Sequence, residues 1–398
     1  MEILRTQYLE KLRAVKDKRL IKVITGMRRV GKSTLLRQFR DEILSSGVSQ
    51  KRTQFYNFEE KSSGAYEEDW QKIHDKIEAN LAKAEMNYIF LDEIQNINEW
   101  EKMVDSLYVK PNVDLYITGS NAYFLSSELS TLLSGRQFEV RMLPFSYKEY
   151  TKQIKDDNDS RLMQYLRYGG MPQAVDFLPD ENLVVEYLEG VYNTVVLKDI
   201  MARVGNSEML TRVMSYAFDN IGNGFSAKKV ADYLCNNYRR VSSDTVEQYL
   251  KAALEAFILY PAQRFNIRGK ELLKTQKKYY LVDTGLRNVL IARGEAFDIG
   301  RALENVVYLE LLRRGCQVFV GQTKSGKEVD FVAKYSSGEI KYYQICETMR
   351  SEDTRARELA SLREIDDNYP KMVLSLDQEE NSFDGIRQTN LRRWLSSE

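Results

Sequence analysis

A short glycine-bearing loop constrains the fold of this chain more than any other feature. Residues 26–33 read GMRRVGKS, which matches the pattern GxxxxGK[ST] of a phosphate-binding loop. An apolar, β-branched run at 21–25 precedes the loop, and residues 34–44 follow it with helical spacing. Because strand, loop and helix occur in the order that such a loop requires, we predict a nucleotide-binding domain here.

The residue types in this loop suit a nucleoside triphosphate. Glycines allow backbone N–H groups to curl around phosphates, and the following helix points its positive end toward them. We expect Lys32 to reach the β- and γ-phosphates and the Ser33 hydroxyl to ligate Mg²⁺. The expected ligands are therefore ATP or ADP with Mg²⁺. The residues expected to bind the nucleotide are Gly26, Met27, Arg28, Arg29, Val30, Gly31, Lys32, Ser33 and Thr34.

A second element, YIFLDE at residues 88–93, is an apolar strand that ends in adjacent carboxylates. One further strand candidate, residues 53–58, lies between this element and the loop. We expect Asp92 to hold Mg²⁺, directly or through water, and Glu93 to polarise the attacking water. A base beside a metal-bridged nucleotide favours hydrolysis rather than binding alone.

Two further positions are candidates with open alternatives. In ITGSN, residues 117–121, Ser120 or Asn121 is expected to contact the γ-phosphate or orient water, or else to cap a helix. Arg136 ends the run SGR before a predicted strand and is expected to act as an arginine finger toward a neighbouring subunit's ATP. The alternative for Arg136 is a surface salt bridge.

Apolar runs alternate with helical segments over the first 150 residues. This alternation predicts a parallel sheet with helices on both faces, so the expected fold class is α/β with a P-loop NTPase sheet. The predicted strands are residues 21–25, 53–58, 88–92, 113–119 and 137–143.

The pattern changes after Tyr150. Residues 155–160, KDDNDS, predict a polar, flexible linker, and residues 161–220 predict helices interrupted at GGMP, residues 169–172. The last hundred residues mix both types of element. Their predicted order is a helix at 301–315, strands at 316–321, 328–335 and 341–349, a helix at 353–366 and a strand at 371–376.

Residues 221–285 have the element order of a winged helix. Two predicted helices precede a hairpin whose strands, 258–266 and 277–283, flank an IRGKE turn. Basic residues there suit contacts with DNA phosphates, or form a solvated face on a domain that packs against protein. The basic residues concerned are Arg239, Arg240, Arg264, Arg268, Lys270, Lys274, Lys277 and Lys278.

Composition excludes several other classes. Lys plus Arg and Asp plus Glu both number 58, which argues against a generally basic nucleic-acid coat. No apolar run is long enough for a membrane helix or a signal peptide, so we expect a cytoplasmic protein without membrane partners. The cysteines, at 235, 316 and 346, form no CxxC motif or disulfide framework. The single histidine, His74, is expected to pack or lie on the surface.

The motifs together resemble a known family. GMRRVGKST, LDEIQNINEW, TGSNAYFLSSELSTLLSGR and LPFSYKEY are similar to prokaryotic AAA+-type ATPases with an AAA_14 domain and a C-terminal DUF4143 region. The similarity continues through YGGMPQAV, VVLKDI, KKYYLVDTGL, RALENVVYLELLRRG and EVDFVAKY. The resemblance implies an AAA+ core at 1–150, a helical lid at 151–215, a winged-helix domain at 216–290 and a restriction-endonuclease-like domain at 291–398. It also supports ATP over GTP and functional roles for Asn121 and Arg136.

A nuclease of the implied fold would use an acid on a helix, a strand Asp, and Glu-x-Lys on the next strand. Glu304 and Asp330 occupy the first two positions, but Gln344 and Cys346 stand where the second carboxylate and the lysine belong. Lys334 and Lys341 are near in sequence only. We therefore expect an inactive scaffold that binds DNA or a partner.

The function expected from the sequence is Mg²⁺-dependent ATP hydrolysis that drives a conformational change, with DNA or a DNA-bound protein as the target and a homo-oligomer as the assembly. Three alternatives stay open: an ATP-gated binding module with little turnover, an ATP-dependent nuclease, and a remodeller of proteins other than DNA-bound ones.

Overall fold

The structure is a computed structural model that describes residues 3–59, 69–120, 135–205, 207–238, 240–291 and 297–397. The candidates Asn121 and Arg239 lie outside these residues. The chain divides into two compact units, one of residues 1–142 with 255–257 and one of residues 143–254 with 258–398.

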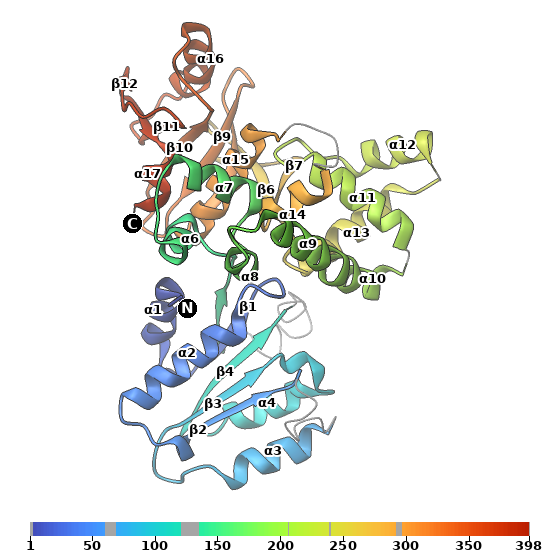
Figure 1. Cartoon of the computed structure of the whole chain (residues 1–398), viewed down its shortest axis with the longest axis vertical. Helices are drawn as coiled ribbons and strands as arrows, with labels where there is room; N and C mark the ends of the chain where they lie inside the picture. Colours follow the sequence, from blue (N-terminus) through green and yellow to red (C-terminus); the bar gives the residue numbers. More distant parts are fainter. Residues whose placement is uncertain are drawn as a thin grey trace. The chain divides into compact units, whose positions relative to one another are not determined.

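The first unit is built on a five-stranded sheet in the order β2-β3-β4-β1-β5, and every neighbouring pair is parallel (Figure 1). This confirms the predicted parallel α/β sheet. Because the strands are parallel, the loop after β1 and the acids that end β3 meet at one edge. The strands are β1 (Ile21–Thr25), β2 (Thr53–Asn57), β3 (Asn87–Asp92), β4 (Val113–Gly119) and β5 (Gln137–Arg141).

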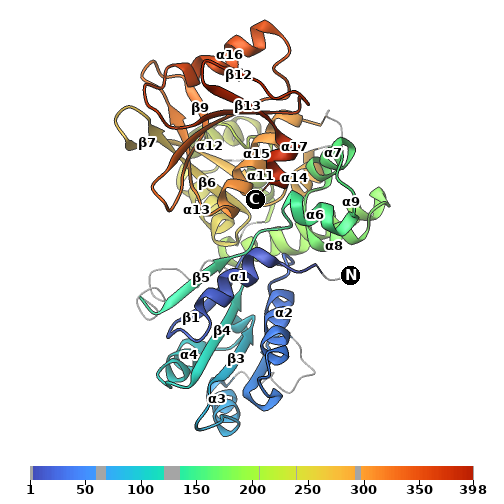
Figure 2. The same ribbon diagram turned by 90° about the vertical axis from the view of Figure 1, so that its left-hand side faces the viewer.

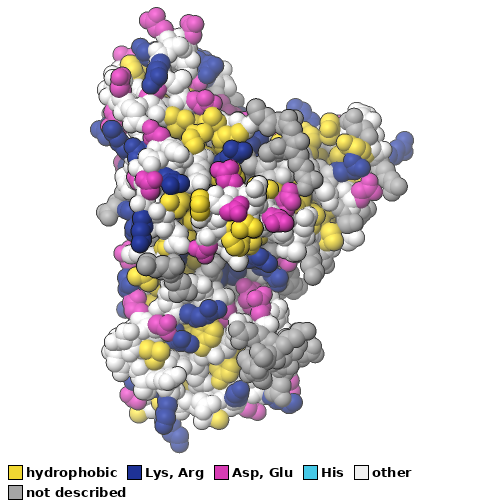
Figure 3. Space-filling view, viewed as in Figure 1, with side chains coloured by type: hydrophobic (Ala, Val, Ile, Leu, Met, Phe, Trp, Pro, Cys, Tyr) yellow, Lys and Arg dark blue, Asp and Glu magenta, His cyan; other side chains and the backbone are white. Residues whose placement is uncertain are grey.

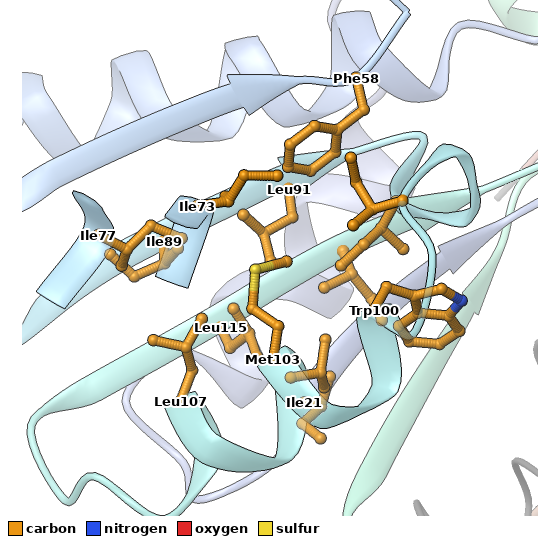
Figure 4. Close-up of a cluster of buried hydrophobic side chains, with 14 of the residues drawn as sticks. Ile21, Phe58, Ile73, Ile77, Ile89, Leu91, Trp100, Met103, Leu107 and Leu115 are labelled. Atoms are coloured by element: carbon orange, nitrogen blue, oxygen red, sulfur yellow. The ribbon is translucent and has the colours of Figure 1, made fainter. Parts of the chain in front are cut away.

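Helices cover both faces of this sheet. On one face, alternate apolar residues of β1, β3 and β4 pack with α3 and α4 into a core that includes Leu91, Ile117 and Met103 (Figure 4). On the other face, the Tyr116 ring stacks on Phe90 and meets Phe39 of α2, with ring centroids 4.9 and 5.3 Å apart. The helices are α1 (Thr6–Val15), α2 (Lys32–Ser45), α3 (Trp70–Ala79) and α4 (Trp100–Tyr108).

A buried ion pair crosses two neighbouring strands of this sheet. Lys22 of β1 is fully buried and donates to Asp114 of β4 and to the Lys18 carbonyl, the latter at 2.7 Å. The Tyr116 hydroxyl donates to the other Asp114 oxygen at 2.7 Å. The charges are therefore both paired and hydrogen-bonded, as burial requires.

The second unit begins with helices, as predicted, and α7 ends at the predicted GGMP break. Gly169 ends α7 at φ 74°, and the Gly170 N–H donates to Asp283 at 2.7 Å. A Cβ on Gly169 would lie 2.0 Å from the Asp283 carboxylate, so only glycine fits. A π-helical turn, η4 (Tyr192–Leu197), joins α9 to α10. The helices are α6 (Tyr147–Ile154), α7 (Asp159–Tyr168), α8 (Pro172–Asp176), α9 (Glu181–Val191), α10 (Lys198–Val204), α11 (Ser207–Asp219), α12 (Ala227–Asn237), α13 (Ser243–Glu255) and α14 (Thr284–Ile291).

The predicted linker at 155–160 joins α6 to α7, and α7 begins within it at Asp159. Asp157 accepts hydrogen bonds from the Tyr147 hydroxyl at 2.8 Å and from Arg392 at 3.2 Å. Asn158 caps α7 by accepting from the Arg161 N–H. The polar residues of this linker cap α7 and pair with Arg392, so their polarity marks a helix boundary.

An eight-stranded mixed sheet completes this unit in the order β12-β13-β11-β10-β9-β8-β6-β7. The hairpin that was predicted as a wing is part of this sheet, because β6 pairs in parallel with β8 from Gln263 to Asn266. That pairing begins after Pro261, which has no N–H to donate. The strands are β6 (Leu259–Asn266), β7 (Glu271–Leu281), β8 (Gln317–Gln322), β9 (Glu328–Lys334), β10 (Ile340–Ile345), β11 (Lys371–Ser375), β12 (Ser382–Phe383) and β13 (Ile386–Asn390). The helices α15 (Ile299–Arg313), α16 (Glu352–Arg363) and α17 (Leu391–Ser396) accompany it.

The visible surface carries basic and acidic side chains interspersed, in keeping with the balanced composition (Figure 3). Within the described residues, no helix combines the length and apolar character needed to cross a bilayer.

Candidate active site

The loop after β1 has the backbone conformation that its glycines allow. Gly26 adopts φ 145°, and a Cβ there would lie 2.3 Å from the Met142 carbonyl oxygen. Gly31 adopts φ 96° at the N-cap of α2. Both positions lie in the region that side chains disfavour, so the loop can curl only with glycine here. Arg29 also has a positive φ, of 69°.

Lys32 opens α2 and is buried inside the loop. Its ammonium nitrogen donates to the carbonyls of Gly26 at 3.1 Å and Met27 at 3.3 Å. The same nitrogen lies 3.3 Å from Oε1 of Glu93, and both side chains are buried. The lysine and the acid that the sequence assigned to one site are therefore in direct contact.

Asp92 ends β3 with its side chain fully buried. The Thr118 hydroxyl donates to Oδ1 at 2.7 Å, while Oδ2 has no hydrogen-bond partner among the described residues. Burial raises the pKa of Asp92, and hydrogen bonds with Thr118 and Ser33 oppose the rise. A buried, unpaired carboxylate oxygen beside a serine hydroxyl fits a hard divalent cation, so Asp92 and Ser33 are suited to hold Mg²⁺.

Glu93 follows Asp92 in a left-handed conformation, at φ 51°. Burial would raise its pKa, but the Lys32 charge, the Gln95 amide and Arg28 together hold the pKa below its usual value. Gln95 donates to Oε2 of Glu93 through its side-chain amide. The carboxylate is thus kept in its charged, proton-accepting form.

Thr118, Gln95 and Glu59 join this site without having been predicted. The Thr118 hydroxyl also accepts the Glu93 N–H at 2.8 Å, so it aligns both acids. Glu59 follows β2, and the nearby charge of Glu93 adds to burial in raising its pKa. Thr118 was within reach of sequence reasoning, since it belongs to the ITGSN motif two residues before the proposed Ser120.

Ser120 lies at the site, as expected for one of the two alternatives at the end of β4. Its hydroxyl oxygen accepts from the Gln95 amide at 3.3 Å and from Arg28 Nε at 3.4 Å. These hydrogen bonds connect Arg28 of the phosphate loop to Glu93 through Ser120 and Gln95. The other alternative, Asn121, lies outside the described residues.

Arg136 is not brought to this site within its own chain. Its carbonyl accepts the Ile21 N–H at the amino end of β1, whereas the phosphate loop follows the carboxyl end. Its guanidinium pairs with Asp105 at 2.9 Å, with both side chains about half exposed. A role toward a neighbouring subunit stays a prediction.

The acids of the nuclease-like pattern meet a lysine from another element. Lys278 of β7 is buried, and its nitrogen lies 3.3 Å from Glu304 and 2.6 Å from Glu328. The Tyr280 hydroxyl donates to the same Glu304 oxygen at 2.5 Å. The interpretation of Lys278 as a DNA contact is therefore wrong, because its charge is used inside the sheet.

Asp330 and Gln344 are held by contacts within the protein. Burial and the Glu304 charge raise the pKa of Asp330 well above its usual range, against the effect of Lys278. The Gln344 amide donates to Glu358 of α16 at 3.1 Å. Among the described residues, the carboxylates of Glu304, Glu328 and Asp330 do not form a group whose ligand atoms all lie within 4.8 Å of one another. Burial also raises the pKa of Cys346 to about 12, so this thiol stays neutral.

The other basic residues of the hairpin differ in exposure. Arg264 pairs with Glu328 at 2.9 Å and is partly buried. Lys334 lies over the Phe265 ring and Lys341 over the Tyr335 ring, so neither replaces the lysine of the nuclease pattern. The residues that stay exposed are Arg240, Arg268, Lys270 and Lys277. The Lys274 side chain is not described.

His74 contacts Ser106 of α4 through Nε2 at 2.8 Å and meets the Trp70 ring edge-on. These contacts fit the packing role expected for it. The three cysteines are free, as expected.

Two family models match the chain. An AAA domain model matches residues 18–151, which contain the loop, both acids and Thr118. A domain of unknown function, DUF8612, matches residues 159–296, whereas the resemblance had implied a DUF4143 region.

Two relatives align over most of the chain. An uncharacterised protein of Haemophilus influenzae is 38% identical over 409 residues, covering 99% of this chain and 98% of its own. The uncharacterised protein MJ1544 of Methanocaldococcus jannaschii is 28% identical over 369 residues, covering 85% of this chain and 78% of its own.

A solved structure shares the fold. The Walker-type ATPase PABY2304 of Pyrococcus abyssi matches with a TM-score of 0.50 and 16% identity, over 73% of this chain and 96% of its own. Together with the phosphate loop and its paired acids, these similarities show that the chain carries an AAA-type domain with the fold of a P-loop ATPase and belongs to the same family as the Haemophilus influenzae protein.

Proposed function

We propose that this protein binds ATP with Mg²⁺ in the loop of residues 26–34 and hydrolyses it with Glu93 as the general base. One observation carries the proposal: the buried Lys32 ammonium lies 3.3 Å from Glu93, beside an Asp92 oxygen that has no partner among the described residues. A cation, a base and a carboxylate oxygen suited to ligate a metal are thus held within one small volume.

ATP binding replaces the contacts that Lys32 makes in its own chain. The ammonium exchanges the carbonyls of Gly26 and Met27 and the Glu93 carboxylate for the β- and γ-phosphates. Ser33 and Asp92 would hold Mg²⁺, which supplies charge neutralisation for the phosphates. The exchange also releases the Glu93 carboxylate from the Lys32 ammonium, so that Glu93 can accept a proton from the attacking water.

Hydrolysis then needs one proton acceptor. The water oxygen forms a bond to the γ-phosphorus, the bond from that phosphorus to the bridging oxygen breaks, and the water proton passes to Glu93. Its lowered pKa keeps the carboxylate ionised before attack. Gln95 orients Glu93, and Thr118 fixes both acids through the Glu93 N–H and the Asp92 carboxylate. We assign Asn121 to the γ-phosphate and Arg136 to a neighbouring subunit's ATP.

The decisive test compares wild type with Glu93→Gln, which preserves the hydrogen-bonding shape of the side chain. We expect the steady-state ATPase rate to fall roughly a hundredfold or more, since a general base contributes about that much. ATP affinity, measured by calorimetry with Mg²⁺, should stay within a few-fold of wild type. Equal turnover in both proteins would refute the base assignment, and absent turnover in wild type would favour a binding module.

We propose further that hydrolysis drives a conformational change in the second unit, where residues 151–215 act as a lid and residues 291–398 as a scaffold without nuclease activity. Light scattering with and without ATP tests assembly. Arg136→Ala should reduce ATPase activity only where a complex forms. The absence of nuclease activity is tested by incubating the protein with DNA and Mg²⁺ or Mn²⁺. DNA cleavage that Asp330→Ala abolishes would contradict the scaffold role of residues 291–398.

DNA binding by the tip of the β6–β7 hairpin is a second candidate function. Arg268 and Lys270 are exposed there, Lys277 is exposed further along β7, and Arg268 and Lys324 line a cavity of about 570 Å³. Cations in such a group suit phosphate contacts whose strength falls with salt. A DNA mobility shift that weakens in Lys270→Glu, but not in the exposed control Lys51→Glu, would support it.

A further inference from the structure

A second cavity lies in the C-terminal sheet, at a distance from Asp330 along the strands. It has a volume of about 340 Å³ and opens where β9 has ended and where β10 and β11 begin. Asp330 and Gln344 lie toward the opposite ends of β9 and β10. Figure 2 shows β13 and α17, which supply further walls.

The lining of this cavity is cationic. Four basic side chains line it with one carboxylate, that of Glu339, which is 44% exposed and 3.4 Å from Lys341. Two of the four, Arg314 and Lys371, also pair with Glu310 and Asp367, which are not part of the lining. The basic residues come from four separate elements of the fold. They are Arg314 after α15, Lys341 on β10, Lys371 on β11 and Arg387 on β13.

Two of these cations are held in place by the protein. Arg314 pairs with Glu310 at 2.9 Å, donates to the Trp394 carbonyl at 2.6 Å and lies over the Trp394 ring. Lys371 donates to the Asp367 carbonyl at 2.6 Å. Side chains fixed in this way lose little freedom when they bind a ligand, which favours affinity.

Arg387 differs from the other three cations. It is exposed and has no ion pair with a described residue. Its five N–H donors are therefore available to an anion at the mouth of the cavity.

The aromatic wall adds hydroxyl groups. The hydroxyls of Tyr335 and Tyr343 lie 3.0 Å apart, and the Tyr343 ring packs at 63° against Trp394. Burial raises the pKa of both tyrosines, so both hydroxyls keep their protons. After their mutual hydrogen bond is made, one of the two hydroxyl protons is left, and the Cys316 sulfur and a ligand can both accept it.

We propose that this cavity binds the phosphate group of a small phosphorylated molecule of about nucleotide size. A phosphomonoester presents a double negative charge and several acceptor oxygens, which match converging cations and hydroxyl donors. The volume falls within the range of small-molecule sites, roughly 300 to 1,000 Å³. This site is independent of the phosphate loop, because no residue is shared.

The test uses AMP, inorganic phosphate and adenosine as probes in calorimetry, with Lys32→Ala as the parent so that the phosphate loop is disabled. We expect AMP and phosphate to bind and adenosine not to bind. Adding Arg387→Ala should weaken AMP binding roughly tenfold, as loss of a charge-assisted hydrogen bond does. Arg387 is exposed, so its loss should leave the fold intact.

The control is Arg393→Ala. Arg393 is an exposed residue of α17 next to Trp394, it pairs with Glu380, and it does not line the cavity. This variant should leave AMP affinity unchanged. The proposal is overturned if neither AMP nor phosphate binds the parent, or if both arginine variants weaken AMP equally. As a second readout, quenching of Trp394 fluorescence by AMP should disappear in Arg387→Ala.

Discussion

The ammonium nitrogen of Lys32 lies 3.3 Å from Oε1 of Glu93, with both side chains buried. The pair neutralises the site before nucleotide binds, and it also makes each charge depend on the other. Removing one partner leaves a buried charge uncompensated, which costs more than removing both.

This dependence predicts the stability of loop variants. Lys32→Ala should lower the free energy of unfolding by about 3 kcal/mol, because Glu93 then stays buried without its cation. Lys32→Ala/Glu93→Gln should recover most of that loss. Urea unfolding of both single variants and the double variant measures the coupling. Additive effects of the two changes would show that the pair is not coupled.

Gln95 should set the pH at which ATP hydrolysis fails. Its amide donates to the Glu93 carboxylate and favours the charged form, so Gln95→Leu should raise the pKa of Glu93. A general base is lost as the pH falls through its pKa, so the acid limb of the kcat/KM profile should move to higher pH. Asn96→Ala is the control, because the Asn96 side chain donates to the Phe58 carbonyl instead. An unmoved acid limb in Gln95→Leu would count against this role.

Asp92 should show opposite effects on stability and activity. Burial raises its pKa, so the ionised form costs free energy in the folded state, and that cost grows as the pH rises. Asp92→Asn can still accept the Thr118 hydrogen bond and should therefore raise Tm more at neutral pH than near pH 3, which is below the ordinary pKa of an aspartate of about 3.9. Its Mg²⁺-dependent ATPase rate should fall to background. Retained turnover would exclude Asp92 as the metal ligand.

The buried pair of Lys22 and Asp114 should be the most sensitive point of the ATPase sheet. Asp114→Ala leaves Lys22 as an unpaired buried cation and should cost about 3 to 5 kcal/mol in urea unfolding. Lys22→Met/Asp114→Leu removes both charges and should be more stable than Asp114→Ala. A double variant that is less stable than the single one would mean that the hydrogen bonds, not the charges, dominate.

Asp283 should give the second unit an unusual pH dependence. Burial raises its pKa from 3.8 to about 6, although the N–H groups of Gly170 and Leu286 oppose the rise. The folded pKa is above the unfolded one, so its contribution to stability is present below about pH 4 and is lost as the pH rises through about 6. The difference in unfolding free energy between wild type and Asp283→Asn should fall by a few kcal/mol at most over that range. A constant difference would place the pKa near its ordinary value.

Sequence reasoning identified the strands of the ATPase sheet and the loop, because both are local. The apolar runs of β1, β3 and β4 and the glycines at 26 and 31 follow from side-chain type and backbone freedom at single positions. The same reasoning placed Glu93 and Asp92 correctly at a strand end, since parallel strands bring their carboxyl ends to one edge.

Contacts between distant segments had no such local signal. Thr118 reaches Asp92, and Ser120 reaches Gln95, only because β4 lies beside β3 in the sheet. The sequence predicted that the hairpin is the wing of a winged helix, because nothing near residues 259–281 in the sequence shows that β8 pairs with β6.

Charged residues show most clearly what the sequence alone does not reveal. By sequence Lys278 is one of several lysines on a hairpin, and in the structure it is buried between Glu304 and Glu328. The sequence determined which chemical groups this protein has and where the phosphate loop begins. Only the tertiary structure decided which charges are paired and which remain available to a ligand, because burial and pairing depend on residues that are far apart along the chain.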